Sequence, residues 1–305
     1  MKKILIFLAI LSMVLMNVFA DEQQDSVPPS KWKQYWKFSG TVGLKISQTQ
    51  LVNWAAGGNS SLTGVSFANL VLKYKKQKIA WDTNLDTDFG VLYSSDFLTY
   101  NWRKTNDKIL FTTTFGYEIG PQDKKSRWYA AANSTFRSQY TIGYEYPEDG
   151  SRNKVSNWLS PSFTAFSVGV NWKWTELITV YLSPLASLIT SCTDSVLRHS
   201  YGVPADKTFF ASLGMAFNAG IVYDGVKNLR IATGVQLYTP YTDKEQKFGH
   251  FNVDWNVMIT YQFLKVLNVS LTTNLKYYPK ILFEEPPHKR VQFQEMFGLG
   301  VAYSF

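Results

Sequence analysis

From residue 36 onward, the chain is built of stretches in which bulky apolar residues alternate with small or polar ones. The last stretch places Phe, Leu, Val, Tyr and Phe at the odd positions of 297–305, with Gly, Gly, Ala and Ser between them. A period of two is typical of a β-strand whose two faces meet different surroundings. The same pattern predicts twelve strands, at residues 36–48, 62–76, 79–93, 105–119, 128–144, 159–172, 177–191, 208–223, 229–238, 249–262, 266–278 and 290–305.

The connections between these segments alternate in length. The odd-numbered connections are long and polar, at 49–61, 94–104, 145–158, 192–207, 239–248 and 279–289, and the even-numbered ones are shorter. Outer-membrane barrels join their strands by short periplasmic turns and longer external loops, an alternation not expected of a Greek-key sandwich. The pattern therefore predicts an all-β fold, a twelve-stranded antiparallel transmembrane β-barrel in up-and-down meander order over residues 36–305.

Aromatic residues, 16% of the chain, gather at the ends of the predicted strands. One group falls at the ends predicted to be periplasmic: Trp36, Tyr74, Trp81, Tyr117, Trp128, Trp172, Tyr223, Tyr261, Tyr303 and Phe305. A second falls near the opposite ends: Tyr93, Trp102, Tyr144, Trp158, Tyr238, Phe251 and Tyr277. Two such girdles are typical of strands that cross a bilayer, whereas a soluble core would gather its aromatic residues in mid-strand.

The N-terminus predicts export. Lys2 and Lys3 precede an apolar run from Ile4 to Val18, and Ala20 ends a short segment suited to cleavage. We expect residues 1–20 to be a signal peptide, rather than a retained anchor helix, and residues 21–35 to be an N-terminal periplasmic segment. The expected location is the outer membrane of a Gram-negative bacterium after signal-peptide cleavage, in contact with outer-membrane lipid.

Charge and cysteine content narrow the function classes. The formal net charge is +8, and removing Lys2 and Lys3 leaves +6, but the basic residues are scattered rather than clustered. We therefore expect no nucleic-acid binding. The single cysteine, Cys192, allows no intrachain disulfide and lies in a polar stretch, where we expect it to be incidental.

Several motifs resemble the domain-of-unknown-function 3078 family. They include Trp36-Lys37-Phe38-Ser39-Gly40, the block Asn53-Trp54-Ala55-Ala56-Gly57-Gly58-Asn59-Ser60, and Trp81-Asp82-Thr83-Asn84-Leu85-Asp86. The chain departs from the family at Thr83, where the family usually continues Trp-Asp-Asn. The resemblance implies an outer-membrane barrel and assigns no activity.

The block that contains Trp54 falls in the first predicted external loop. Gly57 and Gly58 would allow a tight fold that places Trp54, together with Asn53 and Asn59, in the barrel mouth. The alternative is a structural clasp between loop and rim, which we favour. At the other end of the chain, Tyr303 and Phe305 resemble the signal by which barrel proteins transiently engage the barrel assembly machinery.

If the bulky residues face lipid, their neighbours face the lumen. The predicted lumen then carries a charged strip made of Lys37, Lys45, Lys73, Asp82, Asp86, Asp88, Arg137, Arg230, Asp254 and Lys276. A turn at 77–78 would set Lys73 opposite Asp82. Such charges could hold the wall together by ion pairs, or form a transverse field that orients a polar solute. The three aspartates are too widely spaced for a calcium site, and we expect neither metal nor cofactor.

The expected function is a passive channel for small polar solutes or a structural wall protein. A lipid-modifying enzyme of the phospholipase or deacylase type is one alternative, but it needs a Ser–His pair on the lipid face. His199 and His288 fall in predicted loops and His250 faces the predicted lumen, so we expect no enzyme activity. A plugged structural or assembly barrel is the other alternative.

Overall fold

The computed structural model describes residues 34–49, 61–95, 97, 99–119, 126–147, 150–175, 177–242, 246–264, 267–279 and 291–305. The chain divides into two compact units, Met1–Tyr35 and Trp36–Phe305, and only the last two residues of the first unit are described. In the described residues, no helix has the length and apolar character needed to cross a membrane.

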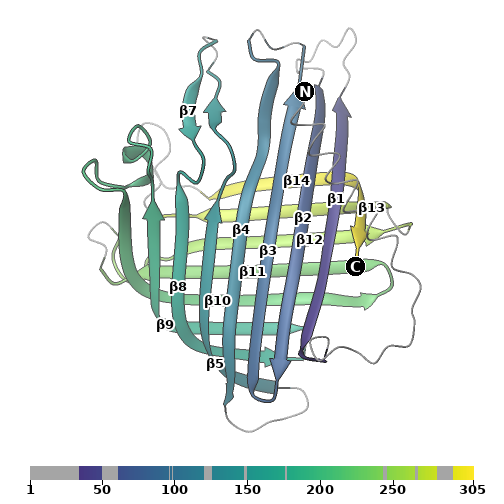
Figure 1. The fold of residues 1–305 in the computed structure, drawn as a ribbon, viewed down its shortest axis with the longest axis vertical. Helices are drawn as coiled ribbons and strands as arrows, with labels where there is room; N and C mark the ends of the chain where they lie inside the picture. The colour runs from purple at the N-terminus through teal and green to yellow at the C-terminus, as the bar shows by residue number, and fades with distance from the viewer. Residues whose placement is uncertain are drawn as a thin grey trace. The chain divides into compact units, whose positions relative to one another are not determined.

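The second unit is a closed barrel of twelve strands (Figure 1). Its strands are β1 (Trp36–Thr49), β2 (Ser61–Lys76), β3 (Ile79–Tyr93), β4 (Trp102–Ile119), β5 (Ser126–Ser138), β8 (Ser162–Trp174), β9 (Ile178–Ser191), β10 (Phe209–Val226), β11 (Leu229–Pro240), β12 (Asn252–Gln262), β13 (Leu267–Tyr277) and β14 (Gln292–Ser304). Each pairs antiparallel with the next along the chain, and β14 closes on β1. The predicted all-β meander barrel is therefore confirmed. In Figure 1, the purple to blue strands β1 to β4 stand in front of the green to yellow strands β10 to β14, which cross behind them.

The alternation in sequence becomes the two faces of the wall. On β14, Phe297 is 74% exposed, Leu299 55% and Val301 51%, whereas Gly300 and Ala302 between them are buried. Every other barrel strand except β11 and β13 likewise exposes at least one large apolar side chain. An apolar exterior around a polar interior is the reverse of a soluble protein and is the arrangement of transmembrane barrels.

The closing seam joins β1 to β14 from Thr41↔Ser304 to Lys45↔Gly300. Gly40 and Phe305 extend it by two backbone hydrogen bonds, of 2.9 and 3.0 Å. At Gly43 the strands approach so closely that a Cβ atom would lie 2.6 Å from the carbonyl oxygen of Val301. Closure gives hydrogen-bond partners to both edge strands, which lipid cannot supply.

One predicted strand, 128–144, is wrong at its external end. β5 stops at Ser138, because the carboxylate of Asp107 accepts the backbone N–H groups of Tyr140 (2.7 Å) and Thr141 (2.8 Å) and turns the chain away. Residues beyond this turn form β6 (Gly143–Glu145), which pairs with β7 (Asn153–Ser156) in a separate two-stranded sheet. Tyr144 therefore belongs to this hairpin and not to a strand of the barrel.

Three other strands begin three residues away from the predicted position. β4 begins three residues early, at Trp102. β8 begins at Ser162 rather than 159, since Asn157 and Ser160 close a turn through backbone hydrogen bonds of 2.7 and 3.0 Å. β12 begins at Asn252, so His250 lies in a loop and not on a lumen-facing strand position.

Two external connections are joined into one body. Asp194 accepts hydrogen bonds from Lys154 Nζ (2.6 Å) and Asn157 Nδ2 (3.0 Å), and Tyr201 Oη donates to the carbonyl of Val155 (2.6 Å). Behind these contacts lies a small apolar cluster of Cys192, Leu197 and Val203. Cys192 has no exposed surface, so it lies in an apolar cluster although its neighbours in sequence are polar.

Candidate functional site

The strand registers determine which charged side chains share the inner face. Outside the bulged ends of β4 and β10, ten cationic residues have inward positions in the described ladders: Lys37, Lys45, Lys73, Lys75, Lys108, Arg127, Arg137, Lys173, Arg230 and Lys276. Five carboxylates share that face: Asp82, Asp86, Asp88, Glu118 and Asp254. Ten cations less five carboxylates leave an excess of five positive charges on the described inner face. The ten residues of the predicted strip are all in this set.

Near the barrel end that the sequence predicts to be periplasmic, a buried carboxylate is held by two cations. The Glu118 side chain is 2% exposed and lies 2.8 Å from Lys75 Nζ and 3.1 Å from a guanidinium nitrogen of Arg127. Lys75 also donates to the hydroxyl of Tyr129 at 3.1 Å. Burial makes these charge-assisted bonds strong and makes the loss of a partner costly.

Next to this group, Asp82 forms an ion pair with Lys173 of β8, with Nζ 2.7 Å from Oδ2. Lys73 lies opposite Asp82 in register, as the turn at 77–78 predicts. Lys173 was missed, since the predicted strand ended at residue 172 and left it in a turn. β8 is three strands away from β3, so this ion pair spans β4 and β5 on the inner wall.

Halfway along the lumen, Asp86 and Asp88 share one cation. Lys108 Nζ lies 2.9 Å from Asp86 and 3.1 Å from Asp88, which accounts for both carboxylates without a metal ion. Across the closing seam, the Lys45 side chain lies over Gly298 and Gly300, within 3.3 Å of where their Cβ atoms would be. The space beside these glycines is therefore filled by a lysine.

Near the external end, the lumen is crossed from wall to wall. Tyr278 Oη, just after β13, donates to both carboxylate oxygens of Asp254 at 2.8 Å, and Lys276 Nζ lies 3.7 Å from the same group. β5 and β13 are six strands apart in either direction around the ring. Arg137 of β5 nevertheless comes close enough to the Tyr278 hydroxyl for the two groups to interact electrostatically. Side chains from opposite walls therefore reach toward each other at this level of the described lumen.

The remaining predicted residues are more peripheral. Lys37 and Arg230 are exposed near the periplasmic end. Phe305 packs at the seam with ring centroids 5.5 Å from Phe38 and 6.1 Å from Tyr303. The loop motif of Asn53, Trp54, Gly57, Gly58 and Asn59 lies outside the described residues.

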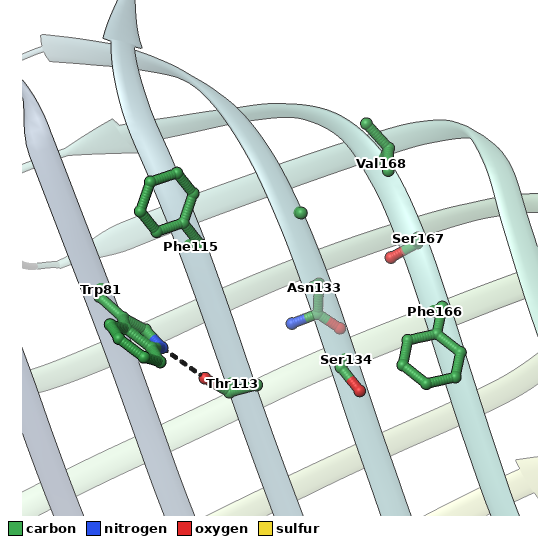
Figure 2. Close-up of a pocket in the computed structure, with 9 residues that line it drawn as sticks. Trp81, Thr113, Phe115, Asn133, Ser134, Phe166, Ser167 and Val168 are labelled. Atoms are coloured by element: carbon green, nitrogen blue, oxygen red, sulfur yellow. Dashed lines mark hydrogen bonds between the residues drawn. The ribbon is translucent and has the colours of Figure 1, made fainter.

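The outer wall carries a shallow apolar groove across β3, β4, β5 and β8 (Figure 2). Its volume is about 300 Å³, and small residues such as Ala132 lie between the rings of Trp81 and Phe115 on one side and Phe166 on the other. The indole N–H of Trp81 donates to Thr113 Oγ1 at 2.7 Å, so the ring keeps a hydrogen bond on the apolar face. Neither described histidine is nearby in the fold, because His199 and His250 both lie in external connections.

Sequence reasoning missed six residues that make these contacts: Lys75, Lys108, Glu118, Arg127, Lys173 and Tyr278. A signal existed for three of them, and Lys75 lies two residues after Lys73, on the same face of its predicted strand. Lys108 and Glu118 are at even-numbered positions, as are Thr112 and Thr114, and these positions form the polar face of their predicted strand. Arg127, Lys173 and Tyr278 lie at or just beyond predicted strand ends, where parity was not applied.

Comparison with known proteins supports the recognised resemblance over part of the chain. Residues 46–144 match the family described as "Protein of unknown function (DUF3078)". No curated protein matches the sequence.

Among solved structures, the chain is similar to an outer membrane channel from Pseudomonas putida F1, with 12% identity and a TM-score of 0.39 over 92% of this chain and 100% of that one. It is also similar to the NanC porin, with 9% identity and a TM-score of 0.38 over 87% and 98%. The translocator domain of the autotransporter NalP from Neisseria meningitidis gives 10% identity and a TM-score of 0.33 over 100% and 98%.

Proposed function

We propose that this protein is an outer-membrane β-barrel that passes small polar solutes by diffusion and prefers anions. The observation that carries the proposal is an inner face with ten cations and five carboxylates inside an apolar outer wall. The apolar wall suits lipid, and a polar, charged interior has no role in packing a dry core.

The excess positive charge gives the proposed channel its preference. Cations on opposite walls of a narrow, low-dielectric passage raise the local concentration of anions. Each lumen carboxylate has at least one cation within 4 Å. The five carboxylates together offset only part of the positive charge, because there are ten cations. The result is a passage that repels cations more than it repels anions.

A structural barrel with a closed lumen is the second candidate. The electrostatic interaction of Arg137 with the Tyr278 hydroxyl across the lumen supports it, since side chains that reach toward each other from opposite walls obstruct the passage. The two candidates differ in solute flux, and not in fold.

Solute efflux from vesicles tests the proposal. Refolded protein is placed in vesicles loaded with succinate, or with a neutral sugar of similar size. We expect both to leave faster than from protein-free vesicles, with succinate ahead of the sugar. Efflux equal to that of protein-free vesicles for both solutes would support the closed structural barrel instead.

We further propose that residues 1–20 are removed as a signal peptide and that residues 21–35 form a periplasmic segment ahead of the barrel. The motif around Lys2, Lys3 and Ala20 supports this. N-terminal sequencing of the protein extracted from outer membranes should read from Asp21. A sequence that starts at Met1 would contradict cleavage.

A further inference from the structure

Polar side chains from opposite walls converge near the external end of the lumen. Arg137 comes from β5, Lys276 from β13, and Gln292 is the first residue of β14 and the register partner of Lys276. All three have inward positions. Arg137 also stacks its guanidinium 4.8 Å from the ring centroid of Phe163, which holds the charge against the wall.

The positive charges in this group exceed the negative ones. Arg137 and Lys276 are close enough to repel each other, and Asp254 is the carboxylate nearest to Lys276. Asp254 already accepts the Tyr278 hydroxyl at both oxygens. Its 3.7 Å separation from Lys276 Nζ is longer than a charge-assisted hydrogen bond of about 2.7–2.9 Å. Lys276 therefore has only a distant carboxylate, and that carboxylate is already occupied.

Gln292 adds an independent observation. Its Nε2 atom is buried and has no hydrogen-bond acceptor among the residues that the structure describes. Buried amide donors are nearly always satisfied, so an unpaired one beside the cation of Lys276 indicates a place for an acceptor. An oxyanion would supply that acceptor and would also relieve the repulsion between Arg137 and Lys276.

We propose that Arg137, Lys276 and Gln292 form a binding site for a small oxyanion, a carboxylate or a phosphate, within the lumen. The planar guanidinium can donate two parallel hydrogen bonds to such a group, the ammonium adds a point charge, and the amide donates one further bond. The site deepens the proposed function and rests on it, because a solute reaches these residues through the lumen.

Titration calorimetry on the refolded barrel in an uncharged detergent tests the site. The probes are succinate and inorganic phosphate, each titrated separately at low ionic strength. We expect saturable binding of at least one probe. Arg137→Gln and Lys276→Gln should each weaken it about tenfold or more, and Gln292→Leu should weaken it less, because it removes a neutral donor. The stronger of the two probes identifies the oxyanion chemistry.

Lys207→Gln is the matched control, since Lys207 is an exposed lysine in an external connection and loses the same charge. It should leave the Kd within about twofold of the wild-type value. Gel mobility before and after boiling shows that each variant is folded, and Lys276, 38% exposed, is the variant least able to disturb folding. The absence of saturable binding of either anion would overturn the site. An equal loss of affinity in Arg230→Gln would also overturn it, because that result would show only a diffuse charge effect.

The outcome is separable from that of the channel proposal. Binding in detergent together with vesicle efflux no faster than without protein would keep the site and end the channel proposal. Efflux without saturable binding would do the reverse.

Discussion

At the scale of single residues, Glu118 shows how a charged lumen can also stabilise its wall. Its carboxylate is almost fully buried, yet Lys75 and Arg127 are each more than 40% exposed. The buried member of such a group depends on its partners, because an unpaired carboxylate in a low-dielectric site is costly. The exposed members are free to meet solvent and ions.

Removal of both cations should therefore destabilise the barrel. We expect Lys75→Ala combined with Arg127→Ala to lower the free energy of unfolding by about 3–5 kcal/mol, because Glu118 stays buried without a cation. Adding Glu118→Gln should recover part of the loss. Urea unfolding followed by gel mobility measures both changes. An unchanged urea midpoint in the double variant would show that Glu118 does not need these partners.

The shared cation of Asp86 and Asp88 leads to a selectivity prediction. Asp86→Asn with Asp88→Asn removes two of the five lumen carboxylates and leaves Lys108 with no carboxylate at these two positions. Reversal potentials in a salt gradient should then move further toward anions. Glu295→Gln is the control, since Glu295 is exposed at an outward position of β14. Equal selectivity in the wild type and the double variant would mean that these residues do not face the ion path.

At the scale of elements, the joined external connections respond to acid. The hydrogen bonds that Asp194 accepts from Lys154 and Asn157 favour its ionised form and lower its pKa below the ordinary value. A carboxylate with a lowered pKa in the folded state stabilises that state above its unfolded pKa of about 3.9. That stabilisation is lost as the pH falls through the lowered value.

Cys192 can report this opening, because its thiol is fully buried beside the Asp194 contacts. We expect a disulfide-exchange reagent that stays reactive in acid to label Cys192 slowly from pH 5 to 7 and faster below about pH 4. Asp194→Asn should label faster across the neutral range. Labelling that is independent of pH in both proteins would show that Asp194 does not hold these connections together.

The seam gives a second prediction at this scale. Phe305→Ala keeps the backbone hydrogen bonds to Gly40 but removes ring contacts with Phe38 and Tyr303, at a cost of about 1 kcal/mol. Refolding into detergent, followed by the appearance of the fast-migrating folded band, should be slower. Phe297→Ala, at a site 74% exposed on the same strand, should refold at the wild-type rate. Equal refolding rates for both variants would show that the Phe305 ring does not contribute to barrel closure.

The strands could be predicted because each one alternates between lipid and lumen, and that contrast is local in sequence. The ends of the strands could not be predicted where a residue distant in sequence determines them. β5 stops because of Asp107, which is 33 residues before Tyr140 in the chain. The alternation of odd and even positions also predicted that Lys73 and Asp82 face the lumen. It did not predict the ion pair between Asp82 and Lys173, because contacts along the inner wall depend on strand tilt.

At the scale of the whole barrel, the proposed function depends on what opposite walls bring together. β5 and β13 lie opposite each other in the ring, and Arg137 and Tyr278 interact electrostatically across it. A twelve-stranded ring lies between barrels filled by side chains and barrels that enclose a water channel. The charged contacts narrow the passage, so we expect a small conductance rather than that of a wide pore.

Current through a planar bilayer is the most direct test of the channel proposal. Purified, refolded protein is added to one side, and a potassium chloride gradient is imposed. We expect small, steady current steps. The reversal potential should be displaced from zero toward the equilibrium potential of chloride, as the excess of five lumen cations requires. Protein that is folded by gel mobility and passes no current at any voltage would contradict the channel and leave the structural barrel as the function.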